Sequence, residues 1–163
     1  MKAPVDPARL ANAIIATGST LLREAGRLFK PHGVTAVQFN VLHLLSDVPG
    51  GLRPSELTAA LVVDASSTTY VMDRMETLGW LKRVDDKADR RAWRVVLTPA
   101  GQKRHAALAP LYFAALGEML RRLRRTDVAR VVAALEGIPA AAHAAVDAAL
   151  AKPGTPTRRG VKS

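Results

Sequence analysis

The sequence predicts a mainly α-helical fold with one small β-hairpin. Long segments place apolar residues three and four positions apart, which is typical of helices with one buried face. Two short strand-like runs, residues 81–84 and 94–97, flank a polar, charged segment that is typical of a turn. At 163 residues, the chain has the length of one domain with helical extensions.

The first helix is expected to be long. It should begin after Asp6, a capping residue followed by proline, and end near Lys30, because Pro31 cannot continue it. Its apolar stripe consists of Leu10, Ile14, Leu21, Ala25 and Leu28. A stripe of this length needs a surface to pack against.

Two shorter helices should follow. The run Thr35–Gln38 is a capping box that opens the second helix, and Pro49–Gly51 ends it. Its expected inner positions are Val37, Val41, Leu44, Leu45 and Val48. Pro54 then opens a third helix, although Arg53 stands where a Ser or Thr cap would be better. The apolar positions of this third helix are Leu57, Ala60 and Leu61.

A fourth helix has two different faces. Asp64 is an N-cap residue type, so the helix should begin at Ala65, and Gly79 should close it. Its apolar stripe is Thr68, Val71, Met72, Met75 and Leu78. Its outward face carries Ser66, Ser67, Thr69, Tyr70 and Arg74. Hydroxyls, a phenol and a guanidinium at the front of a helix are groups that a DNA major groove accepts, with an ordinary solvated face as the alternative.

The hairpin after this helix is basic. Between positions 82 and 94, six basic residues outnumber three acidic ones, Asp85, Asp86 and Asp89. The basic residues are Lys82, Arg83, Lys87, Arg90, Arg91 and Arg94. Core packing explains such a hairpin tip poorly. The pattern predicts a wing that reaches a DNA minor groove, because this narrow, negative channel attracts arginine.

Thr98 and Pro99 form another cap followed by proline, and they start a fifth helix that should extend to about Arg125. Its apolar positions are Leu108, Leu111, Ala115, Met119 and Leu123. The basic run Arg121–Arg125 would offset the dipole at the helix C-terminus, with a second DNA contact as the alternative reading.

The last helix should be capped by Thr126 or Asp127, bend at Gly137–Pro139 and reach Leu150. Its alanine-rich second half favours close approach between helices. The tail, residues 152–163, is basic with almost no apolar side chains, and we expect it to be disordered and to attract phosphates.

Four segments, taken in order, carry a resemblance to a known family. They are Gln38–Leu42, Met72–Glu76, Gly79–Arg83 and a run anchored by Asp89, Arg91, Leu97, Thr98 and Gly101. With this order and spacing, roughly residues 8–150 resemble the winged-helix transcription regulators of the MarR (multiple antibiotic resistance regulator) type.

The resemblance implies a domain organisation. A winged helix-turn-helix DNA-binding domain, residues 34–98, would lie between an N-terminal dimerisation helix, residues 1–33, and C-terminal dimerisation helices, residues 99–151. The expected partner is double-stranded DNA, bound by a homodimer at an inverted-repeat operator, and the expected effect is repression.

The resemblance also implies roles for single residues. Arg91 would be the wing-tip arginine and Asp89 its orienting partner, while Lys87 and Arg90 are expected to contact phosphates. Tyr70 stands where relatives often have arginine, so a base preference cannot be transferred from them.

Many regulators of this type bind small aromatic acids between the winged domain and the dimerisation helices. Arg27, Phe39 and His43 lie on helices that would border such a cleft, and a packing or surface role is the alternative for each. A small-molecule effector is therefore a possible partner.

Composition limits the remaining classes. The net charge of +10 and the pI near 10.8 favour a polyanionic partner. The absence of cysteine excludes disulfides and the thiol-based peroxide sensing that some members of the resembled family use. There is no run of 18 apolar residues and no apolar signal-type segment, so we expect a soluble, cytoplasmic protein without membrane contact.

An enzyme is not expected. The four histidines, His32, His43, His105 and His143, are scattered without metal-ligand spacing, and no glycine-rich phosphate loop occurs. No catalytic residue, metal or cofactor is therefore predicted. Two other classes stay open, a nonspecific architectural DNA-binding protein and a ligand-binding protein whose winged domain contacts another protein.

Overall fold

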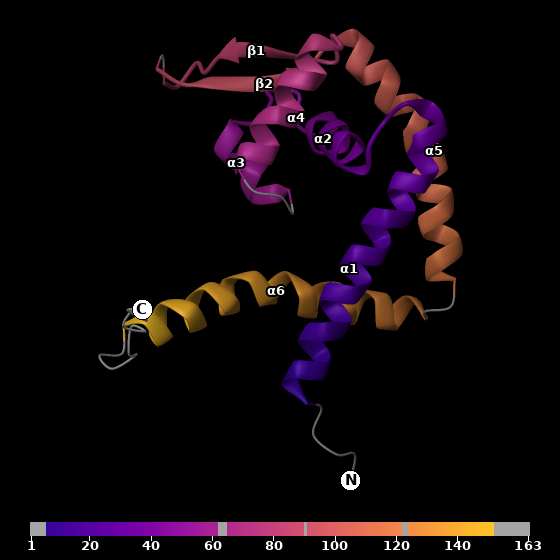
Figure 1. Cartoon of the computed structure of the whole chain (residues 1–163), viewed down its shortest axis with the longest axis vertical. Helices are drawn as coiled ribbons and strands as arrows, with labels where there is room; N and C mark the ends of the chain where they lie inside the picture. Colours follow the sequence, from indigo (N-terminus) through magenta and orange to yellow (C-terminus); the bar gives the residue numbers. More distant parts are fainter. Residues whose placement is uncertain (1–5, 62–64, 90, 122–123, 152–163) are drawn as a thin grey trace, which may run out of the picture. The chain divides into compact units, whose positions relative to one another are not determined.

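The computed structural model describes residues 6–61, 65–89, 91–121 and 124–151. The chain divides into two compact units, Met1–Leu116 and Gly117–Ser163. The elements, drawn in Figure 1, are α1 (Pro7–Phe29), η1 (Lys30–His32), α2 (Ala36–Ser46), α3 (Pro54–Ala60), α4 (Ala65–Thr77), β1 (Leu81–Asp85), β2 (Trp93–Leu97), α5 (Pro99–Leu120) and α6 (Arg125–Leu150). The mainly helical fold with one hairpin is confirmed.

Three predicted helix starts have the expected capping hydrogen bonds. Asp6 Oδ1 accepts from the Ala8 N–H at 3.0 Å. Thr35 Oγ1 accepts from the Gln38 N–H at 3.1 Å, and Gln38 Oε1 accepts from the Thr35 N–H at 2.9 Å, which completes the capping box. Thr98 Oγ1 accepts from the Gly101 N–H at 3.1 Å. The predicted cap at Asp64 lies outside the described residues.

Arg53 at the start of α3 is explained by its other contacts. The Glu56 carboxylate accepts from the Arg53 N–H at 2.6 Å, so the helix start is satisfied without a capping side chain at position 53. The Arg53 guanidinium is then available to Asp86, which it contacts at 2.7 Å. A Ser or Thr at this position would lose that contact.

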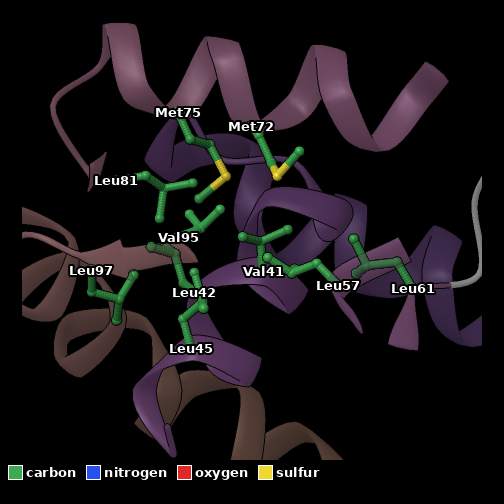
Figure 2. Packing of buried hydrophobic residues seen from close by; sticks show 10 residues of the cluster. All are labelled: Val41, Leu42, Leu45, Leu57, Leu61, Met72, Met75, Leu81, Val95 and Leu97. Atoms are coloured by element: carbon green, nitrogen blue, oxygen red, sulfur yellow. The ribbon is translucent and has the colours of Figure 1, made fainter. Parts of the chain in front are cut away.

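Helix α2 lies between two apolar cores. On one side, Val41, Leu42 and Leu45 pack against residues from α3, α4 and the hairpin (Figure 2). The residues contributed by those elements are Leu57, Leu61, Met72, Met75, Leu81, Val95 and Leu97. On the other side, Phe39 packs with Phe29 and Leu108, and its ring stacks on Phe29 with centroids 4.2 Å apart. The sequence predicted one buried face for α2, but Phe39 and Leu42 are also buried, so the helix is buried over a wider part of its surface than expected.

The hairpin is antiparallel, and its register pairs Leu81 with Leu97 and Asp85 with Trp93. Both strands extend one residue beyond the predicted runs. Gly79 has a φ of +71°, as expected for the residue that closes α4. The stripe of α4 was predicted one residue too long, since Leu78 lies beyond the end of the helix and is 37% exposed.

The boundary between the last two helices differs from the prediction. Helix α5 ends at Leu120 rather than near Arg125, and Arg121 forms an ion pair with Glu118. Helix α6 already begins at Arg125, after an N-cap residue without a side-chain capping bond, so the predicted caps Thr126 and Asp127 lie inside the helix. Of the basic run, Arg125 is the first residue of α6, which agrees with the good helix propensity of arginine. Leu123 and the tail after position 151 lie outside the described residues.

Several helices keep apolar side chains exposed. Leu10, Ile15 and Leu21 are exposed on α1. On α6 the exposed apolar residues are Val131, Val132, Leu135, Ile138, Val146 and Leu150. By length and composition alone, Asp127–Leu150 is apolar enough to cross a membrane, and the same properties suit a helix that packs on a partner.

Gly101 lies in the first turn of α5, directly against the turn that follows α4. A Cβ at this position would lie 2.1 Å from the Trp80 carbonyl oxygen. We expect Gly101→Ala to lower the free energy of unfolding by about 1–3 kcal/mol in urea denaturation. Gly117→Ala is the control in the same helix, because a Cβ there meets nothing within 4 Å and alanine favours helix. Equal stabilities of the two variants would contradict the close approach.

Candidate nucleic-acid interface

Helix α4 presents two faces with different environments. Thr68, Met72 and Met75 are buried against the rest of the first unit. Ser66, Thr69, Tyr70 and Arg74 are exposed, and Ser67 is half-buried. Tyr70 is 73% exposed, which leaves a large aromatic side chain in solvent. The outward face predicted from the sequence therefore points away from the core.

A shallow hollow lies beside this face, between the start of α2 and α4. It is lined by Val37, Ser66, Ser67, Tyr70 and Val71. Serine and apolar side chains thus line the hollow next to Tyr70.

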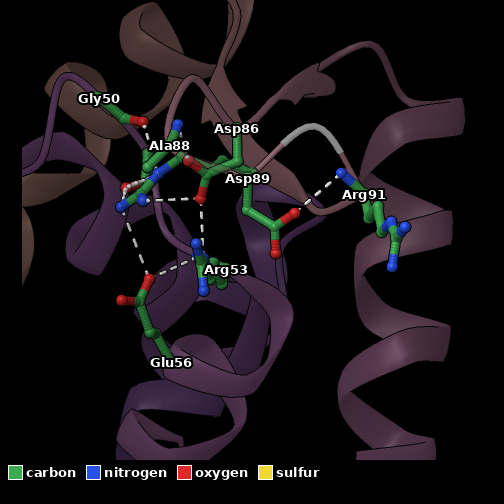
Figure 3. A network of polar contacts seen from close by, with 9 residues as sticks. Gly50, Arg53, Glu56, Asp86, Ala88, Asp89 and Arg91 are labelled. Atoms are coloured by element: carbon green, nitrogen blue, oxygen red, sulfur yellow. Dashed lines mark hydrogen bonds and ion pairs between the residues drawn. The ribbon is translucent and has the colours of Figure 1, made fainter.

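A buried carboxylate fixes the base of the hairpin. Asp86 is only 3% exposed, and its Oδ2 accepts from Arg53 Nε at 2.7 Å and from Arg94 Nη1 at 3.3 Å (Figure 3). Its Oδ1 accepts from the Ala88 N–H at 2.9 Å. Because Arg53 precedes α3 and Arg94 lies on β2, Asp86 connects the wing to the helix-turn-helix segment.

Arg94 extends this network to the loop between α2 and α3. Its guanidinium donates to the carbonyl oxygens of Gly51 at 2.8 Å and Gly50 at 3.1 Å, and it lies 3.6 Å from the Glu56 carboxylate. Arg94 is therefore occupied by internal contacts and is not a free basic group of the wing.

The environment of Asp86 favours its charged form. The hydrogen bond from the Ala88 N–H and the Arg53 guanidinium together lower the pKa of Asp86 to about 2, despite its burial. The same contact raises the pKa of Arg53. Asp86 and Arg53 therefore form an ionised pair at neutral pH.

The tip of the wing is shaped by Asp89. Its Oδ1 accepts from the main-chain N–H of Arg91 at 3.0 Å, and its carbonyl oxygen accepts from the Ala92 N–H at 2.9 Å. Asp89 therefore orients the main chain at Arg91, while the Arg91 side chain is exposed and extends from the tip (Figure 3). Lys87 is also exposed, and Arg90 lies outside the described residues.

Arg83 is the second basic residue of the hairpin with internal partners. It forms ion pairs with Asp73 and Glu76 of α4 and lies over the Trp93 ring at 4.5 Å from its centroid. Among the described residues, the exposed hairpin cations outside these ion pairs are Lys82, Lys87 and Arg91. Sequence patterns do not indicate that Arg53, Asp86 and Arg94 form a unit. Its only local signal was an aspartate that directly follows a strand.

The three candidate ligand residues have different surroundings. Phe39 is completely buried in the second core. His43 is half-buried and stacks with His105, whereas Arg27 is exposed and pairs with Glu24 of its own helix at 2.7 Å. Within the described part of the chain, no group of three or more His, Cys, Asp or Glu side chains is placed to hold a metal ion.

Two helices, α3 and α4, followed by a hairpin with an exposed basic tip define a winged helix-turn-helix protein. Residues 32–92 match a protein-family model described as MarR family. This segment, a little over a third of the chain, is similar to the MarR family of transcriptional regulators.

Individual relatives and solved structures show the same similarity. The chain is 28% identical over 99 residues to the HTH-type transcriptional regulator PecS of Dickeya dadantii, a match that covers 60% of this chain and 60% of PecS, less than two thirds of that protein. The structure is similar to a mutant of Escherichia coli MarR complexed with operator DNA, with a TM-score of 0.68, 27% identity and coverage of 80% of this chain and 93% of that one. It also has the fold of CouR from Rhodococcus jostii bound to p-coumaroyl-CoA, with a TM-score of 0.73, 22% identity and coverage of 85% and 95%.

Asp86→Asn tests the network at the base of the wing. The carboxyl group ionises near pH 3.8 when unfolded and near 2 when folded, so its stabilising effect is complete above about pH 3.8 and is lost as the pH falls towards 2. We expect the variant to lower the Tm at pH 7 by on the order of 5 °C. We also expect its Tm to depend less on pH than the wild-type Tm below about pH 4.

The matched control is Asp85→Asn at the neighbouring, exposed position. It removes the same charge without touching Arg53 or Arg94, so its Tm should stay near the wild-type value. Circular dichroism melts at several pH values measure all three proteins. Identical acid dependence of Asp86→Asn and wild type would contradict the role of the buried carboxylate.

Proposed function

We propose that this protein is a cytoplasmic, homodimeric DNA-binding repressor that recognises an inverted-repeat operator. The observation that carries the proposal is the exposed polar face of α4 beside a rigid wing with Arg91 at its tip. The charge of +10 favours approach to DNA but does not by itself select a sequence.

In this proposal, α4 enters the major groove. Ser66, Ser67, Thr69 and Tyr70 read base edges or adjacent phosphates, and Arg74 holds a phosphate or a base edge. The buried face of the same helix, with Met72 and Met75, fixes its orientation on the protein. A rigid helix of this kind presents its polar side chains in one geometry.

The wing would supply the second contact. Arg91 would enter the minor groove, while Lys87 and Arg90 would bind phosphates and fix position rather than sequence. Asp89 assists by holding the main chain at Arg91, which sets the direction from which the side chain leaves the turn.

Dimerisation would use both ends of the chain, residues 1–33 and 99–151. The exposed apolar residues of α1 and α6 support this assignment, because they lack cover within a single chain. Two α4 helices about one turn of DNA apart would then read two half-sites.

Release by a small aromatic or phenolic ligand completes the proposal. CouR, whose structure contains p-coumaroyl-CoA, supports this idea by its fold alone. Of the three candidate residues, His43 and Arg27 keep some exposed surface and could contact a ligand directly. Phe39 is buried and would support the wall of the binding site.

The function is tested by selecting binding sites from random duplex DNA at about 150 mM salt, where nonspecific attraction is reduced. We expect an inverted repeat with half-sites about 10 base pairs apart. Equal, salt-sensitive binding to every duplex would favour the alternative function, a nonspecific architectural protein.

Arg91→Ala tests the wing on the selected site. We expect it to weaken specific binding by about 1–3 kcal/mol, measured by fluorescence anisotropy with labelled duplex. Arg23→Ala is the control, because it removes the same charge from an exposed position on α1. An equal loss of DNA affinity in the two variants would mean that Arg91 contributes only its charge and makes no specific contact.

The dimer is tested by sedimentation equilibrium at micromolar concentration. We expect a species of twice the 17.4 kDa chain mass. Replacing Val131 and Leu135 of α6 by Ser should shift the equilibrium towards the monomer, since both side chains are exposed in the single chain. A wild-type protein that sediments only at 17.4 kDa would overturn the dimer.

A further inference from the structure

Two histidines that are far apart in the sequence meet between α2 and α5. His43 Nδ1 and His105 Nε2 are 3.2 Å apart, and the two rings are stacked with centroids 5.4 Å apart and an interplanar angle of 21°. Both residues belong to the first unit, and both are half-buried. This is a direct polar contact between α2 and α5, which also contribute Phe39 and Leu108 to the second apolar core.

Aromatic rings surround the pair. The ring centroid of Phe39 lies 6.0 Å from that of His43 and 5.9 Å from that of His105. The ring of Phe113 meets that of His43 edge-on, with centroids 5.5 Å apart. The ring centroid of Tyr112 lies 6.4 Å from that of His43. These rings limit access of water, so a positive charge on the pair would be poorly solvated.

The chemistry of the contact depends on protons. At 3.2 Å, one nitrogen must carry a hydrogen and the other must accept it, which requires at least one neutral ring. A first extra proton can enter on an outer nitrogen and leave the N–H···N bond intact. A second one places two N–H donors and two positive charges against each other, so the bond is lost.

We propose that the His43–His105 pair is an acid-sensitive latch between α2 and α5. It holds the two helices together while it shares one proton, and it releases them when both rings become charged. Helix α2 also carries Val41, Leu42 and Leu45, which support α4 from the other side. Release of the latch would therefore loosen the support of the recognition helix, a consequence that rests on the proposed function.

The surroundings of the pair disfavour its protonation. Burial of His105 and the proximity of His43 lower the pKa of His105 below its ordinary value of 6.5. Asp47, which follows α2, acts in the opposite sense. Among the described residues, the titratable groups that face the pair are thus Asp47 from the end of α2 and Tyr112 from α5, while α1 presents Phe29 to the same cluster.

The sign of the pH dependence follows. A histidine with a lowered pKa stabilises the fold fully above about pH 6.5, and this contribution is lost as the pH falls through the folded-state pKa. The latch therefore holds at neutral pH and weakens in mild acid.

The test uses the full-length protein and two readouts that need no DNA. Histidine ring resonances are titrated by NMR, and the Tm is measured between about pH 7.5 and 5.0, for wild type and His105→Gln. We expect His105 to titrate below the ordinary histidine pKa of 6.5. We also expect the wild-type Tm to fall by about 4 °C more than the Tm of His105→Gln over this range.

His32→Gln is the matched control, because it removes an exposed imidazole and should leave the acid sensitivity unchanged. Should His105→Gln not fold, His105→Phe keeps a ring in the aromatic cluster without a titrating group. The latch is overturned when His105 titrates at or above the ordinary histidine pKa of 6.5, or when wild type and the His105 variant lose stability in parallel.

Binding to the selected DNA site then tests the regulatory consequence. Wild-type affinity should fall between about pH 7.5 and 5.5 relative to that of His105→Gln, by up to about tenfold for one proton coupled over one pKa unit. Equal pH profiles would overturn the coupling to α4. Failure to select any site would instead count against the proposed function, since the resonance and melting measurements stand without DNA.

Discussion

Burial of α2 on two opposite sides is the constraint on which the first unit depends. Its Val41, Leu42 and Leu45 complete the core beneath α3, α4 and the hairpin, while Phe39 completes the core with α1 and α5. Close packing makes such a helix sensitive to displacement on either side, because a small shift opens voids in both cores. Any event at the α5 side, whether a ligand or a proton on His105, therefore has a physical route to α4 through a single rigid element.

The wing depends on a different interaction, the buried Asp86 carboxylate. Burying this charge costs desolvation, which the Ala88 N–H and the guanidiniums of Arg53 and Arg94 offset. Such a cluster holds the base of the hairpin in place, because loss of any one partner would leave a buried charge incompletely compensated. The arginines of this hairpin therefore have different roles. Arg83 and Arg94 form internal ion pairs that hold the hairpin in place, whereas Arg91 extends outwards.

Short-range patterns account for what the sequence could predict. The caps at Asp6, Thr35 and Thr98 involve neighbours within three residues, and the outward face of α4 follows from helical periodicity. Contacts between distant residues were out of reach, because Asp86 meets Arg53 across 33 positions and His43 meets His105 across 62. The ends of α5 and α6 were misplaced for a related reason, since a basic run suits either helix and only its surroundings decide.

The exposed helices suggest that the single chain is not the complete folded unit. Helix α6 has 26 residues, and its large apolar side chains, such as Val131 and Leu135, are exposed. Most helix stability in proteins comes from packing of an apolar face rather than from intrinsic propensity, so a helix of this kind needs a partner surface. Under the proposed dimer, association through α6 would contribute to folding itself, and dimer formation and the order of the C-terminal helices would be lost together.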